Sequence, residues 1–183
     1  MRSLVLTAAF AIVLGSALAA AAVGRRATAA PSAPTAQDEL EKVRPVAGSA
    51  VHYLSTAITH SQQATETGLI QTSTETIDLN GDLTGRILYQ PTTVIDFATQ
   101  TLVNTGHQIF SGTVLGSAPV MLHDDAFRFD VDLATSAGVG KVYLTDNIAG
   151  PKIRCELDVI ATGMTPERNV NASYTGVCRF RSN

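Results

Sequence analysis

Two stretches near the C-terminus, KIRCELDVIAT (residues 152–162) and ASYTGVCRF (residues 172–180), decide the fold. In both, apolar and polar residues alternate, as they do in a β-strand with one buried face. Cys155 and Cys178 both fall in the apolar phase. A turn midway between them places the two cysteines opposite each other on adjacent antiparallel strands. The sequence therefore predicts a disulfide between Cys155 and Cys178, with two buried free thiols as the alternative.

The amino terminus indicates export to a compartment in which such a disulfide forms. Arg2 precedes an uncharged apolar run over residues 4–23, and Ala27-Thr28-Ala29 fits the small-x-small pattern that signal peptidase recognises. An uncleaved membrane anchor is the alternative, because about 20 apolar residues can span a bilayer. The second half of the run is mostly alanine, which is only weakly apolar, and this favours a cleaved signal. We therefore expect a secreted or periplasmic protein with no membrane span after cleavage.

The export signal divides the chain into three expected segments. We predict a signal peptide over residues 1–29, a flexible leader rich in Ala, Pro and Thr over residues 30–48, and a β-barrel domain over residues 49–183. About 150 residues remain after cleavage, which is enough for one domain with its own hydrophobic core.

The composition disfavours nucleic acid as a partner. The chain has a formal net charge of −3, its basic residues are scattered, and it contains no tryptophan. Binding to a phosphate backbone needs a clustered basic face, and single-stranded nucleic acid is usually held by stacking on aromatic side chains. The composition leaves the oligomeric state open.

Alternation with a period of two continues through almost all of the sequence after residue 50, where threonine is abundant and lysine is rare. Both features are typical of β-strands and not of exposed helices. Asn80-Gly81 supplies a hairpin turn, and Pro91 predicts an edge position or a bulge in its strand. The expected strands cover residues 51–59, 69–79, 85–97, 101–115, 120–133, 138–146, 152–162 and 172–180.

About eight consecutive strands joined by short turns predict an antiparallel meander. Closure of such a sheet into a single β-barrel removes its exposed edges and leaves an interior that side chains or one small ligand can fill. A two-sheet β-sandwich is the alternative, although the segments are long for a sandwich and their glycines fit the bends of a barrel. In outline, the string of strands is similar to lipocalin-like (calycin) barrels and to allene-oxide-cyclase-like barrels. This similarity is architectural and transfers no functional residue.

Three side chains are candidates for an interior ligand site. His107 shares its strand phase with Ile109, so the alternation places it inside the barrel beside Tyr89 or Tyr174. Histidine and tyrosine side chains can orient a bound ligand by hydrogen bonding. The sequence names no catalytic residue and carries no cofactor motif, so whether the protein is an enzyme stays open.

Two polar clusters imitate metal sites, and we expect neither to bind a metal. In the segment His123-Asp124-Asp125 only the first and third residues share a strand face, and the sequence supplies no further ligand. The spacing Asp78-x-Asn80-x-Asp82 imitates the start of a calcium loop, but the position that needs glycine holds Leu83. A polar turn and a hairpin explain these two segments more simply.

A predicted barrel in which no set of catalytic residues can be recognised favours the function of a secreted protein that binds a small apolar or lipid-like ligand. One alternative is a cofactor-independent enzyme of the cyclase or isomerase kind, in which a buried histidine or carboxylate acts on a bound apolar substrate. The other alternative is a structural or interaction module with a filled core. An interior cavity would separate the first two from the third, and an ionisable interior side chain with a perturbed pKa would favour the enzyme.

Overall fold

The computed structural model describes residues 41–181, which contain ten β-strands and no helix that could cross a membrane. The expected signal peptide over residues 1–29 lies outside the described residues. The strands are β1 (Lys42–Ala64), β2 (Gly68–Gly81), β3 (Leu83–Asp96), β4 (Thr101–Val114), β5 (Val120–Asp124), β6 (Arg128–Asp132), β7 (Ala137–Leu144), β8 (Asp146–Ala149), β9 (Ile153–Met164) and β10 (Val170–Phe180).

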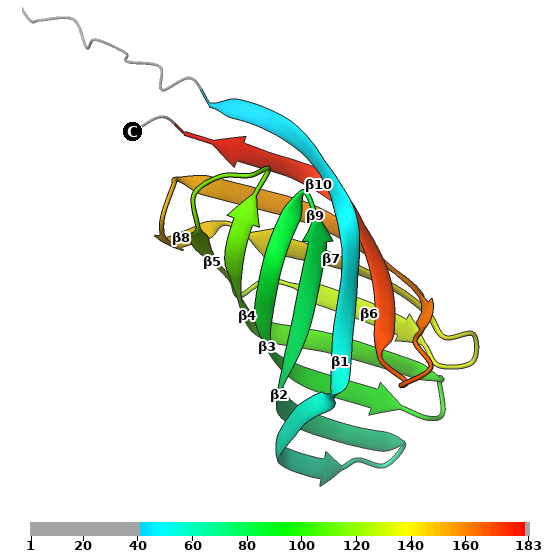
Figure 1. Ribbon diagram of the computed structural model, residues 1–183. Helices are drawn as coiled ribbons and strands as arrows, with labels where there is room; N and C mark the ends of the chain where they lie inside the picture. The colour runs from blue at the N-terminus through cyan, green and yellow to red at the C-terminus, as the bar shows by residue number, and fades with distance from the viewer. Residues whose placement is uncertain (1–40, 182–183) are drawn as a thin grey trace, which may run out of the picture. The chain divides into compact units, whose positions relative to one another are not determined.

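Eight of these strands form a closed antiparallel barrel in the order β1-β2-β3-β4-β6-β7-β9-β10. The ring is closed because β1 pairs with β2 along one side and with β10 along the other. Figure 1 shows this closure, with β1 in cyan running beside β10 in red. Each strand pairs with its neighbour along the chain, apart from the interposed β5 and β8. The prediction of an eight-stranded meander barrel is therefore confirmed, and the sandwich alternative is excluded.

The expected strand over residues 120–133 is two strands, because the chain breaks between β5 and β6. At the break, the buried Asp124 carboxylate accepts hydrogen bonds from the backbone N–H groups of Ala126 and Tyr143. One end of β4 pairs with β5 and the other end pairs with β6. Strand β8, which the alternation did not predict, pairs with β5 outside the main ring.

The first strand starts earlier than the sequence suggested. Residues 30–48 were expected to form a flexible leader, but β1 begins at Lys42, so residues 42–48 are part of the barrel. They pair with β10, from Lys42 opposite Phe180 to Gly48 opposite Tyr174. Pairing with an available neighbouring strand orders this segment in spite of its proline and small residues. The rest of the expected leader, up to residue 40, lies outside the described residues.

One end of the barrel is filled by a tightly packed core, which we call the packed end. It also contains the disulfide: Cys155 and Cys178 are paired in the β9–β10 register, with 4.1 Å between their Cα atoms. The predicted disulfide is thus confirmed, and no free cysteine remains among the described residues. The packed end consists of fully buried side chains from six strands: Leu83, Phe110, Val114, Leu122, Leu144, Ile153, Cys155 and Cys178.

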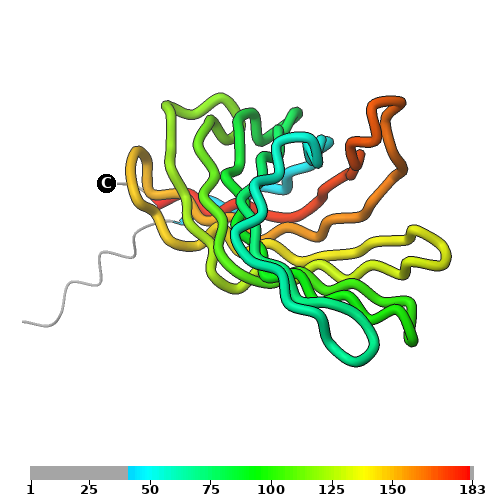
Figure 2. The backbone as a smooth tube through the Cα atoms, turned by 90° about the horizontal axis from the view of Figure 1, so that it is seen from below, coloured from blue at the N-terminus to red at the C-terminus, as the bar shows by residue number. Residues whose placement is uncertain are grey.

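The opposite end of the barrel is formed by four hairpin turns, at residues 65–67, 97–100, 133–136 and 165–169. Because the strands run up and down in succession, these four turns share one end, and several of them project together on one side of Figure 2. We call this the open end, because the interior cavity reaches the surface here.

Candidate ligand-binding cavity

The interior beside the packed end is a cavity of about 340 Å³. Most of the side chains that line it are apolar, among them Val142, Leu157 and Val159. Its lining includes the exposed Met164 at the open end and the buried Leu79 toward the packed end. The cavity therefore reaches the surface at the open end. Its volume lies near the lower limit for small-molecule sites, which is about 300 Å³.

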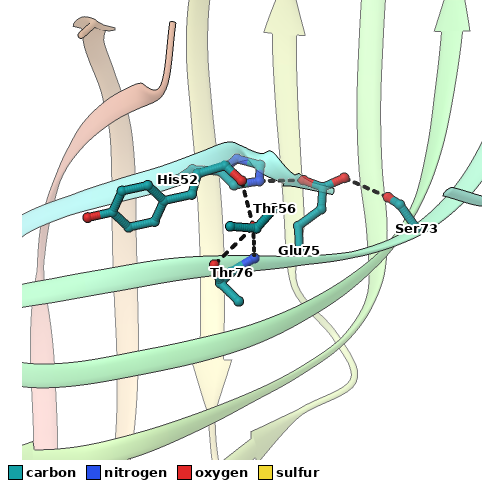
Figure 3. A network of polar contacts seen from close by, with 6 residues as sticks. His52, Thr56, Ser73, Glu75 and Thr76 are labelled. Atoms are coloured by element: carbon teal, nitrogen blue, oxygen red, sulfur yellow. Dashed lines mark hydrogen bonds and ion pairs between the residues drawn. The ribbon is translucent and has the colours of Figure 1, made fainter. Parts of the chain in front are cut away.

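A histidine and a carboxylate meet in the wall of this cavity (Figure 3). His52 of β1 lines the cavity, and its Nε2 contacts Oε2 of Glu75 on the adjacent strand β2. The other carboxylate oxygen of Glu75 accepts a hydrogen bond of 2.6 Å from the hydroxyl of Ser73. Both Ser73 and Glu75 are buried. The barrel thus holds an ionisable carboxylate in its wall, with both of its oxygens hydrogen-bonded.

Two opposing effects act on the pKa of Glu75. Burial disfavours the charged carboxylate and raises its pKa, whereas the hydrogen bonds from His52 and Ser73 and the charge of His52 lower it. The hydrogen bonds and the charge prevail together, and the pKa of Glu75 lies below its usual range. Glu75 is therefore anionic at neutral pH in spite of its burial.

The backbone around Glu75 is irregular on both sides. In the β1–β2 pairing the register jumps between Tyr53 and Ile58, so β1 carries extra residues opposite Glu75. Thr56 stabilises this bulge: its Oγ1 donates to the carbonyl of Tyr53 and accepts from the N–H of Thr76 (Figure 3). Bulges often lie next to functional sites, where they re-aim side chains.

The β2–β3 ladder on the other side of Glu75 is also interrupted. Thr72 is paired with Thr92, and the next pair along the ladder is Glu75 with Tyr89. The positions between these two pairs are unpaired, and this gap lies beside Pro91. Proline has no N–H to donate to a neighbouring strand. Of the two predicted positions, an edge or a bulge, the edge is wrong, because β3 pairs on both sides; the β2–β3 ladder is interrupted beside the proline without a change of register. The proline is accommodated by a local gap in one ladder.

Tyr89 links the histidine to the apolar part of the cavity. Its ring stands edge-on to His52, with 5.4 Å between the ring centroids, and its other neighbour is Phe127 at 4.9 Å. Burial raises the pKa of the Tyr89 hydroxyl far above its ordinary value, and the negative charge of Glu75 raises it further, although the Asn104 amide opposes them. Tyr89 is consequently a neutral hydroxyl that can donate a hydrogen bond.

Strand β4 contributes two amide side chains to the same wall. Gln108 donates a hydrogen bond of 2.8 Å to the buried carboxylate of Asp124. Asn104 also lines the cavity, and its buried Oδ1 has no hydrogen-bond partner among the described residues. A buried acceptor without a donor is costly, and this oxygen is itself shielded from the cavity.

The three expected ligand-site residues occupy different places. Tyr89 and Tyr174 both line the cavity, as the alternation suggested. His107 does not line it: this residue is exposed on the outside of the barrel, stacked on His123 with 5.7 Å between the ring centroids. The expected interior position of His107 is corrected because the inward phase of β4 is that of Asn104, Gln108 and Phe110, with residues 107 and 109 facing outward.

Tyr174 has a structural partner that limits its role toward a ligand. Its hydroxyl accepts a hydrogen bond of 2.8 Å from the N–H of Leu83 and lies within hydrogen-bond distance of the Asn80 carbonyl. The side chain passes so close to Gly48 that a Cβ there would lie 2.3 Å from the tyrosine oxygen. Tyr174 therefore ties β10 to the β2–β3 turn, and only its ring faces the cavity.

Residues of the two polar clusters have partners within the protein. His123 lies 3.4 Å from the carboxylate of Asp146 on the outer face, whereas Asp124 is buried and held by Gln108. In the calcium-like segment, Asp78 forms a salt bridge with Arg86. Residues 41–181 contain no group of three histidine, cysteine or acidic side chains arranged to hold a metal ion.

Sequence reasoning missed the polar centre of the cavity. None of His52, Glu75 and Asn104 is among the candidate residues that the sequence indicated. A signal for Glu75 was present, because the alternation puts Thr74 and Thr76 on one face and therefore Glu75 on the other, with Ile77. A charged residue in the apolar phase of a strand indicates a partner inside the fold.

Comparison with known proteins does not assign a function to this cavity. No protein family matches the sequence, and no curated protein or solved structure is significantly similar to it.

Proposed function

We propose that the protein binds a small, mostly apolar ligand inside the barrel. The observation that carries this proposal is the cavity of about 340 Å³ with a largely apolar lining and an opening at one end. A module with a completely filled core would not maintain such a space, because empty volume in an interior costs stability.

The location that we propose is extracellular or periplasmic. The Cys155–Cys178 disulfide is consistent with it, since such bonds persist in oxidising compartments. In that setting the protein would carry or sequester its ligand outside the cytoplasm.

A second candidate function is a cofactor-independent isomerase or cyclase, and the contact between His52 and Glu75 favours it. A histidine oriented by a carboxylate is a common general base. Tyr89 stands beside it as a neutral hydrogen-bond donor, of the kind that stabilises a developing oxyanion. In this function the same cavity would hold a substrate.

Native mass spectrometry of the protein exported from its own host tests both candidates. We expect a fraction of the protein to carry an additional mass of the size of a small apolar molecule. The variant Ala161→Trp, which places a large side chain in the cavity, should lose this mass. The matched control Ile160→Trp, at an exposed position one residue away, should keep it.

The outcomes separate the candidates. A wild-type protein that carries no ligand and binds no apolar fluorescent probe would overturn the proposal. If the released ligand is incubated with fresh protein in D₂O, an unchanged mass indicates a binding protein. Incorporation of deuterium, or a product with a new retention time, that disappears in His52→Gln would indicate the enzyme.

A further inference from the structure

Large apolar side chains lie at the open end, where the cavity reaches the surface. Leu54 of β1 and Met164 of β9 both line the cavity, and they are 43% and 55% exposed. Leu133 lines it from the turn at residues 133–136, and Phe97, in the turn at residues 97–100, is 55% exposed outside the lining. We call these four side chains the apolar rim. Hairpin turns are usually polar, so apolar side chains that gather beside a cavity mouth mark an interaction site.

Two of the turns hold the rim in the same way. The segments Asp96-Phe97-Ala98-Thr99 and Asp132-Leu133-Ala134-Thr135 differ only in their apolar residue. In each, the aspartate Oδ1 accepts hydrogen bonds from the backbone N–H groups two and three residues later, and the residue after the segment has a positive φ. The repeated construction places Phe97 and Leu133 at equivalent positions.

Backbone hydrogen bonds also join neighbouring turns. The N–H of Phe97 donates to the carbonyl of Thr67 over 2.8 Å, and the N–H of Leu133 donates to the carbonyl of Gln100 over 2.8 Å. Three of the four turns at the open end are therefore connected through the main chain. Because this part of the rim is already held in place, contact with a partner surface needs little further ordering.

The charges at the open end restrict what can cover the rim. The four turns and their flanking residues contain Glu66, Asp96, Asp132 and Glu167 but a single cation, Arg168. A second copy facing the rim, or an anionic lipid surface, would bring like charges together. Neutral phospholipids avoid this repulsion, and their cationic amine groups attract carboxylates.

We propose that the open end docks on the surface of a neutral phospholipid bilayer, with the apolar rim inserted at the boundary between head groups and acyl chains. The acidic side chains of the turns then lie at the level of the head-group amines. This inference goes beyond the proposed function, because it names the phase from which an apolar ligand enters the cavity. It depends on the rim and not on the presence of a ligand.

Flotation with phosphatidylcholine vesicles, using the protein exported from its own host, tests the proposal. We expect wild-type protein to float with the vesicles, and vesicles that contain phosphatidylglycerol to bind less of it. Phe97→Ser should lower the partition coefficient roughly ten-fold, because one aromatic side chain is no longer buried. The matched control Ile148→Ser removes a side chain of similar exposure, 52%, from β8, which pairs with β5 beside the packed end. This control should float like wild-type protein.

A fluorescent variant makes the test independent of the folding of Phe97→Ser. The chain contains no tryptophan, so a single introduced tryptophan reports its own surroundings. Emission from Phe97→Trp should shift to the blue on addition of vesicles and be quenched by brominated phosphatidylcholine. Emission from Ile148→Trp should not change.

Several results would overturn the docking proposal. They are the absence of flotation, equal flotation of wild-type protein and Phe97→Ser, tighter binding to phosphatidylglycerol vesicles, and emission from Phe97→Trp that vesicles leave unchanged. A concentration-dependent dimer in analytical ultracentrifugation that Phe97→Ser abolishes would assign the rim to a second copy, and would overturn it too.

The affinity for an apolar fluorescent probe without vesicles measures the proposed function separately. Phe97 lies outside the cavity lining, so Phe97→Ser should keep this affinity within about two-fold. If the vesicles bind and no probe does, docking stands and the proposed function is overturned. If the probe binds and the vesicles do not, only the docking is overturned.

Discussion

The two ends of the barrel interior are built from the same strands and the same alternation, but they differ in what fills them. At the packed end, large side chains such as Phe110 and Leu122, which are paired on the adjacent strands β4 and β5, are fully buried. Toward the open end, the inward positions hold smaller or polar side chains, such as Ala161, Val159 and Asn104, and a cavity remains. A packed core and a cavity are thus separated along one barrel axis, and the identity of the inward residues makes the difference.

The largest expected effect distinguishes packing at the two ends. Leu122→Ala removes a fully buried side chain at the packed end and should lower the free energy of unfolding by about 3–5 kcal/mol. Leu102→Ala, in the cavity wall, should cost less than about 1.5 kcal/mol, because that side chain is only half-buried and already faces empty space. Urea unfolding followed by circular dichroism measures both. Equal losses would contradict the division of the interior into a packed and a hollow end.

The disulfide provides a second, somewhat smaller test of the packed end. Replacement of both Cys155 and Cys178 by alanine should lower the free energy of unfolding by about 3 kcal/mol, since the bridge closes a loop with a sequence separation of 23 residues. Because the bridge lies away from the cavity, affinity for an apolar probe should stay within about two-fold in the folded variant. A large loss of affinity would show that the two ends are coupled.

The smallest expected effect concerns the carboxylate in the cavity wall. The pKa of Glu75 in the folded protein lies below its ordinary value of 4.5, so the anionic form stabilises the fold at neutral pH. This contribution is present above about pH 4.5 and is lost as the pH falls through the lowered pKa of Glu75. The free energy of unfolding of wild-type protein should therefore fall more steeply below pH 4.5 than that of Glu75→Gln.

A surface carboxylate serves as the control for this pH dependence. Asp78 has its pKa lowered by hydrogen bonds from the exposed Arg86 guanidinium, and solvent screens such a pair. Asp78→Asn should change the acid slope less than Glu75→Gln does. If the two variants behave alike, the interior position of Glu75 has no special effect on stability.

Local alternation predicted most of this fold, because a strand with one buried face carries its pattern in adjacent residues. The segments at residues 152–162 and 172–180 form strands with their apolar phase inward, as predicted, and Cys155 lies directly opposite Cys178. Errors arose where the pattern was ambiguous. His107 follows Gly106, which has no side chain to mark a face, and its neighbour Ile109 is an apolar residue that faces outward.

The candidate site was much less predictable than the fold. Glu75 and His52 lie 23 residues apart in the chain, and the bulge opposite Glu75 leaves no recognisable motif. Likewise, Asn104 is one polar residue among many until the closed barrel shows which face is inside. Pairing between strands, and not spacing along the chain, assembles this polar wall.

The sequence alone determined the strands, their up-and-down succession and the bridge between Cys155 and Cys178. Each of these features depends on neighbouring residues or on a single hairpin. The tertiary structure decided the cavity, its opening and the contact between His52 and Glu75, because these features form only when the barrel closes. They depend on the volumes of side chains from many strands summed across the barrel, and no local pattern encodes that sum.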